Sequence, residues 1–179
     1  YGLSRRWTLQ AGADQYWRDS VPDLFHPYAG VTGSVTNALT VQAEGVAHGY
    51  VRSAISYEPS LDARVTAQYS RFDTGTPSPL ITIPGQRSLA QLSAFYRPIR
   101  DKDFLYLEAG AERSTTVGLV TDRARLAASF QLGAARILPY ARLERETPVG
   151  GATTTHGYWG LNASVLPRRS WGRVLGPAF

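Results

Sequence analysis

Apolar and polar residues alternate through long stretches of the chain, most clearly between residues 88 and 114. In residues 88–97 the even positions are apolar or small, and the odd ones include Gln91, Ser93 and Arg97. The alternation returns in residues 104–112, after a charged turn. Because successive side chains of a strand point to opposite faces, this pattern predicts a hairpin with one apolar and one polar face. Each arm is about ten residues long, whereas an ordinary strand has about five or six.

The same rhythm recurs over most of the chain and predicts about ten strands and no helix. The other strands are expected at about residues 6–16, 29–35, 40–47, 50–57, 61–70, 123–132, 136–144 and 158–165. Short turns are expected at residues 37–38, 58–60, 98–103 and 134–136, and longer loops at 17–27, 73–86, 115–121 and 147–155. The pair His48-Gly49 would have to form an unusually tight turn. We therefore expect an all-β, antiparallel up-and-down sheet that forms a single domain over residues 1–179.

Alternation alone does not distinguish a membrane sheet from a soluble one, but strand length favours the membrane. About ten tilted residues cross a hydrocarbon layer, with apolar side chains toward lipid and polar ones toward a lumen. Aromatic residues near the strand ends on the apolar face suit the membrane interfaces, and they are Trp7, Tyr57, Tyr69, Tyr96 and Trp159. The sequence thus predicts a transmembrane β-barrel of about ten strands, either whole or part of a larger barrel. A soluble all-β binding domain stays open as an alternative.

Composition narrows the functional classes. The chain has 179 residues with 19 Lys+Arg against 14 Asp+Glu, and its basic residues are scattered, so no nucleic-acid-binding stripe is indicated. The absence of Cys excludes disulfides and thiolate metal sites. No apolar run approaches the ~18 residues of a membrane helix. Because no Met is present, even at the start, we expect a processed product or a piece of a longer chain.

In its strand rhythm and its alternation of short turns and long loops, the chain resembles Gram-negative outer-membrane β-barrel proteins over nearly its whole length. The terminal Phe179 resembles the final aromatic residue that the assembly machinery reads in such proteins, although Arg173, Gly176 and Pro177 break the alternation expected before it. The resemblance implies an outer-membrane location. It also implies the lipid bilayer and the outer-membrane assembly machinery as partners, with other subunits or the remainder of a larger barrel as further ones.

Charged residues gather on the predicted polar face, with nearly balanced signs. The candidates for lining a pore are Arg52, Asp62, Arg64, Arg97, Glu108, Glu112, Arg123, Arg125, Arg142 and Glu144. Such charges either pair across strands and fill a narrow interior, or line a water-filled passage. We expect Arg64 to find an acidic partner on an adjacent strand, and Glu108 a basic one.

The favoured function is a pore or translocation conduit. The main alternative is a non-transporting outer-membrane barrel whose loops bind a surface partner, as an adhesin or structural anchor. An enzyme is not expected, because His26, His48 and His156 are dispersed and none has a Ser at the spacing that would place both on one strand face. No cofactor or metal is expected either.

Overall fold

The structure is a computed structural model that describes residues 2–4, 6–15, 25–73, 85–99 and 105–165. These residues form one antiparallel sheet of 11 strands and no helix. The strands are β1 (Gly2–Ser4), β2 (Trp7–Gln15), β3 (Phe25–Ser34), β4 (Leu39–Val46), β5 (Tyr50–Ser60), β6 (Ala63–Phe72), β7 (Gln86–Tyr96), β8 (Tyr106–Thr116), β9 (Leu119–Leu132), β10 (Ala135–Pro148) and β11 (Thr154–Val165). The expected all-β antiparallel architecture is confirmed, with the short β1 as an addition.

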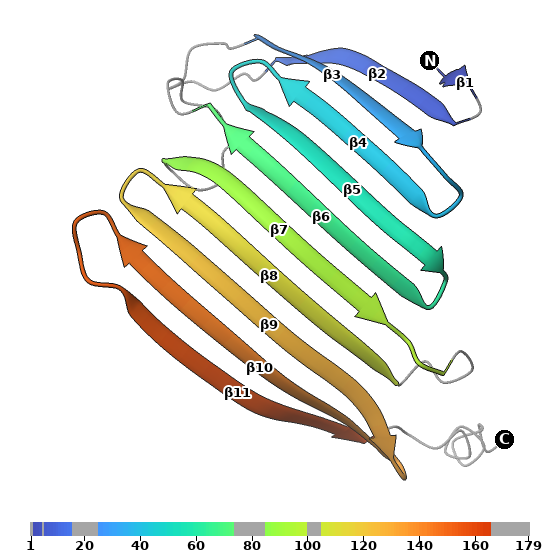
Figure 1. Ribbon diagram of the computed structural model, residues 1–179, viewed down its shortest axis with the longest axis vertical. Coiled ribbons are helices and arrows are strands. Elements are labelled where there is room, and N and C mark those ends of the chain that lie inside the picture. The colour runs from blue at the N-terminus through green and yellow to red at the C-terminus, as the bar shows by residue number, and fades with distance from the viewer. Residues whose placement is uncertain (1, 5, 16–24, 74–84, 100–104, 166–179) are drawn as a thin grey trace, which may run out of the picture.

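Each strand pairs with its neighbours in the sequence, so the sheet is a simple meander (Figure 1). Strands β9 and β10 are each 14 residues long, well beyond the usual length. Within the described residues no ladder joins β11 to β1, and Figure 1 shows them at opposite ends of an open sheet. The closed barrel expected from the sequence is therefore not formed here. Alternation fixes the face on which each side chain lies, whereas closure also depends on strand number, tilt and register shift.

Several turns differ from the expected ones. Strand β5 continues through residues 58–60 with an irregular register, and the turn falls at residues 61–62. The segment expected as a loop at 115–121 is instead a tight hairpin around residues 117–118. Pro59 and the polar residues around it favour turns in a sequence, but a bulge also tolerates proline within a sheet. The tight turn at His48-Gly49 is present, and His48 adopts a positive φ of 56°.

Between β2 and β3, aromatic rings cover glycines on the neighbouring strand. The Trp7 ring lies over Gly33 on the apolar face, and the Tyr28 ring lies over Gly12 on the other face. In each pair the two residues are direct cross-strand partners. A Cβ atom on either glycine would overlap the ring, so these contacts require glycine and fix the strand register.

The described residues contain no buried hydrophobic side chain. The buried side chains are all polar, and they are His26, Ser70, Gln86, Ser114, Thr121 and Ser129. Many large hydrophobic side chains are exposed, for example Val51 at 64% and Leu126 at 59%. The side chains that a water-soluble domain would shelter thus lie outside, and polar ones are sheltered instead.

Candidate functional site: the charged face of the sheet

Register divides the side chains of the sheet into two faces. The apolar face carries, among others, Ile55 on β5, Ala67 on β6 and Leu92 on β7, which are successive cross-strand partners. The opposite face carries the polar partners and is called the charged face below. Along β5, β6 and β8 the charged-face side chains are in most places the less exposed of the two sets. On these strands the polar side chains are therefore more sheltered than the apolar ones.

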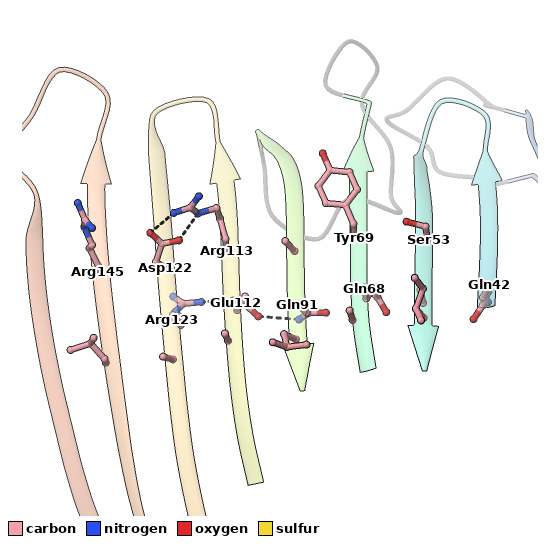
Figure 2. A pocket seen from close by; sticks show the side chains of 18 of the residues that line it. Gln42, Ser53, Gln68, Tyr69, Gln91, Glu112, Arg113, Asp122, Arg123 and Arg145 are labelled. Carbon is pink, nitrogen blue, oxygen red and sulfur yellow. Dashed lines mark hydrogen bonds and ion pairs between the residues drawn. The ribbon is translucent and has the colours of Figure 1, made fainter. Parts of the chain in front are cut away.

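A continuous chain of polar contacts crosses the charged face from β7 to β10. The Gln91 amide donates to Glu112 at 3.0 Å, and Arg123 Nη1 lies 3.2 Å from the same carboxylate. Figure 2 shows Glu112 between Gln91 and Arg123. Arg123 Nε donates to Glu144 at 2.7 Å, and Arg142 donates to the second oxygen of Glu144 at 2.9 Å. Neighbouring carboxylates and guanidinium groups alternate, so no carboxylate in this row lacks a basic partner.

A second cluster lies on β4, β5 and β6, near the turn at residues 47–49. Arg52 forms an ion pair of 3.1 Å with Glu44, and the Tyr50 hydroxyl donates to the same carboxylate at 3.0 Å. The Arg52 guanidinium also lies 5.0 Å from the centre of the Tyr50 ring, which in turn contacts the Phe72 ring with centres 6.2 Å apart. This end of the charged face therefore combines aromatic rings with a paired charge.

A third cluster lies at the opposite ends of the strands. Arg97 donates through Nε to Asp62 at 2.8 Å, and the backbone amide of Arg97 donates to the Asp62 carbonyl at 2.7 Å. Nearby, the Arg136 guanidinium lies 5.5 Å from the centre of the Tyr106 ring and donates to Ser129 at 3.0 Å. Sequence reasoning did not single out Tyr50, Tyr106 or Arg136. Their position among the polar residues of the alternation was the available signal.

The structure brings most of the predicted residues together on the charged face. Arg52, Arg64, Arg97, Arg123 and Arg142 all form ion pairs there. The expected acidic partner of Arg64 is confirmed, since Arg64 Nε lies 2.7 Å from Glu58 on the adjacent β5.

The expected basic partner of Glu108 is wrong for the described residues, which offer it no ion pair. Its direct cross-strand partners are Phe95 and Ala127, so no basic side chain stands opposite it. Glu108 instead lines a small cavity of about 110 Å³ with Arg64 and Arg125. Arg125 likewise forms no ion pair with a described residue, and its side chain lies against Gly110.

The described residues show neither a metal cluster nor a membrane-spanning helix. No three His, Cys, Asp or Glu side chains among them gather closely enough to hold a metal ion. None of the elements they form is a helix long and apolar enough to cross a membrane. Of the loops expected at residues 17–27 and 73–86, residues 25–27 belong to β3 and Gln86 to β7. Residues 17–24 and 74–84 and the terminal Phe179 lie outside the described residues, so the expectations placed on them stay predictions.

Comparison with known proteins finds no matching family model, no matching curated protein and no matching solved structure. Function is therefore inferred from the chain's own residues.

Proposed function

We propose that this sheet is the wall of a transmembrane β-barrel in the outer membrane of a Gram-negative bacterium, where it acts as a pore or translocation conduit. The observation that carries the proposal is the inverted exposure of the two faces. Hydrophobic side chains such as Ile55 and Leu126 are more than half exposed, whereas Ser114 and Thr121 are buried. A hydrocarbon solvent around the apolar face accounts for both features, because it removes apolar side chains from water and leaves polar ones inside.

The magnitude of the exposed apolar surface supports a lipid environment over water. Sheltering one Val, Leu, Ile or Phe side chain from water is worth about 1.5–3 kcal/mol. The exposed hydrophobic residues recur on every strand from β2 to β11 except β4. A soluble domain with that many side chains in water would lack its main source of folding free energy, since folded domains are only about 5–15 kcal/mol more stable than their unfolded chains.

Strand length points the same way. Strands β5, β7 and β8 have 11 residues each, and a barrel strand needs about 9–11 residues to cross the hydrocarbon layer at a tilt of about 45°. The expected asymmetry between short turns and long loops is weaker than the sequence predicts. Residues 117–118 form a tight turn where a longer loop was expected, and β7 ends at Tyr96 and β8 begins at Tyr106, either side of an expected short turn.

A non-transporting anchor is the second candidate, and the ion pairs of the charged face favour it. Glu44, Asp62 and Glu144 are largely sheltered and each contacts at least one guanidinium group. Paired charges that fill an interior fix register without leaving a passage. The two candidates therefore differ in whether water lies between opposite walls of the barrel.

Reconstitution tests the proposal in two stages. The refolded chain is first mixed with phosphatidylcholine liposomes and centrifuged through a density gradient. Flotation with the lipid is expected, whereas protein that stays monomeric in the aqueous fraction at high concentration would refute the membrane assignment and favour a soluble domain.

The inserted protein is then examined in a planar bilayer. Stepwise conductance above that of a protein-free bilayer is the expected result. Insertion without conductance, in the wild type and in Arg64→Ala and Glu108→Ala variants alike, would refute the conduit and support the anchor.

A further inference from the structure

The apolar face is not free of charge along its whole length. Arg113 on β8, Asp122 on β9 and Arg145 on β10 are successive cross-strand partners in one row of this face. Arg71 on β6 lies on the same face and near the same ends of the strands, because its partner on β5 is Val51. These charges lie outside the strands expected from the sequence, which end at residue 112 and resume at residue 123.

The row carries one positive charge in excess. Arg113 donates to both carboxylate oxygens of Asp122, with Nε at 2.6 Å and Nη2 at 3.0 Å (Figure 2). Arg145 lies directly opposite Asp122 in the ladder, yet it makes no hydrogen bond or ion pair with any residue that the structure describes. One carboxylate neutralises only one of the two guanidinium groups, and Asp122 is bonded to Arg113, so the donors of Arg145 are available to an external anion.

The same residues border an open groove of about 830 Å³ on the apolar face. Its lining continues from Arg113 and Arg145 onto Leu143 and a row of small side chains that includes Ala111 and Ala124. These alanines stand directly opposite each other, and Leu143 stands opposite Ala124. The groove is therefore basic at one end and mostly apolar along its floor, with Gln91, Glu112 and Arg123 of the charged face also at its border.

We propose that this groove binds an anionic, phosphate-bearing lipid, with its phosphate at Arg145 and Arg113 and an acyl chain along the floor at Ala111 and Ala124. The proposal rests on the membrane location proposed above. Guanidinium groups bind phosphate through charge-assisted hydrogen bonds, and a hydrocarbon chain matches a floor of small apolar side chains. A net positive row favours a lipid with a net negative headgroup over a zwitterionic one. A free phosphate ion would use the arginines but leave the apolar floor exposed.

Lipid retention by the full refolded chain tests the site. Protein in detergent micelles is titrated with phosphatidylglycerol, with phosphatidylcholine or with inorganic phosphate, and retained lipid is counted by native mass spectrometry. The wild type is expected to retain phosphatidylglycerol in preference to phosphatidylcholine. Equal retention of the two lipids, or complete displacement of phosphatidylglycerol by millimolar inorganic phosphate, would overturn the lipid site.

Single substitutions test whether the row of Arg113, Asp122 and Arg145 causes the preference for phosphatidylglycerol. Arg145→Gln should weaken phosphatidylglycerol retention about fivefold, and Asp122→Asn should strengthen it about fivefold, because each changes the local charge by one unit. The matched control is Arg125→Gln, a change on the opposite face at a residue without an ion pair among those described. An unchanged preference in both row variants, or an equal loss in the control, would overturn the proposal. Asp122→Asn is expected to bind the lipid more tightly, which a folding defect would not produce. The proposal can therefore still be tested if Arg145→Gln fails to fold.

The liposome flotation described above separates failure of the lipid site from failure of the membrane assignment. A protein that floats with phosphatidylcholine liposomes but shows no lipid preference overturns the site alone. A protein that does not float overturns the membrane assignment on which the site rests.

Discussion

Replacing Leu126 with arginine distinguishes a lipid-facing sheet from a water-facing one. Leu126 lies on the apolar face of β9, opposite Ala109 on β8 and Ala141 on β10, and its side chain is 59% exposed. In water, a substitution at so exposed a position usually changes the free energy of unfolding by no more than about 0.5 kcal/mol. In lipid the same change places a cation in hydrocarbon.

The depth of Leu126 sets the magnitude. It lies four positions along β9 from Asp122, which corresponds to about 13 Å at the rise of an antiparallel strand. With a strand tilt of about 40°, this places it about 10 Å deeper in the membrane than the charged row. Because half the hydrocarbon layer is about 15 Å thick, Leu126 lies nearer the midplane than the interface. The expected loss of unfolding free energy for Leu126→Arg is therefore about 2–4 kcal/mol.

The neighbouring residue provides a matched control. Ala127 is on the same strand and at nearly the same depth, but on the charged face and directly opposite Glu108. Ala127→Arg should be neutral or slightly stabilising, because Glu108 has no ion pair among the described residues. Urea unfolding in phosphatidylcholine liposomes, followed by tryptophan fluorescence, measures both variants. Equal tolerance of arginine at the two positions would show that the apolar face does not contact lipid.

Three further outcomes are expected. Glu144→Gln should lower the urea midpoint of unfolding, since Glu144 accepts from two arginines, whereas Glu146→Gln on the same face should leave the midpoint unchanged; equal shifts would contradict the ion-pair row. Gly33→Ala should lower stability by about 1–3 kcal/mol because its Cβ would overlap the Trp7 ring, whereas Gly45→Ala should not, since its Cβ would lie 3.9 Å from Val51; a stable Gly33→Ala would disprove the Trp7 contact. If the charged face lines water, Glu108→Ala should shift the ion selectivity of the conductance toward anions; unchanged selectivity would place Glu108 outside the passage.

The sequence predicted the sheet because its strands keep a strict period of two. The alternation of Val65, Ala67 and Tyr69 with polar residues fixes which face of β6 is apolar, and the structure has the same assignment. The hairpin between β7 and β8 was predicted for the same reason. Of the expected cross-strand pairs, Arg64 with Glu58 was found because the two residues flank one tight turn.

The features that the sequence did not predict depend on the register between strands that are distant in the sequence. The partners of Glu108 depend on the relative shift of three strands, and a shift of one residue exchanges the faces. The charged row on the apolar face was missed because residues 115–121 read as a loop, although extending the alternation by two positions beyond Ala111 reaches Arg113. The aromatic rings over glycine depend on opposite strands and leave no local signal apart from the residue types.

The two edges of the sheet determine what the proposed conduit has to be. A strand edge presents backbone amide and carbonyl groups, and each unsatisfied group in hydrocarbon costs several kcal/mol. Within the described residues, β11 pairs with β10 alone, along a ladder that extends from Ala135 to Glu146. An open sheet of this kind is therefore incompatible with lipid on its free edge.

If the apolar face contacts lipid, as Leu126→Arg tests, the free edge of β11 has to be hydrogen-bonded in the membrane. Its partner is either the opposite edge of the same sheet or further strands. Strand β1 pairs only with Trp7 and Thr8 of β2, so cysteines introduced at Leu161 on β11 and at Ala11 or Ala13 further along β2 separate the two arrangements. Disulfide formation within one chain after insertion would indicate that this sheet closes on itself. The barrel interior would then be only slightly wider than that of an eight-stranded barrel, which side chains fill. The absence of that disulfide in a conducting protein would indicate a wider barrel, in which the paired charges line water.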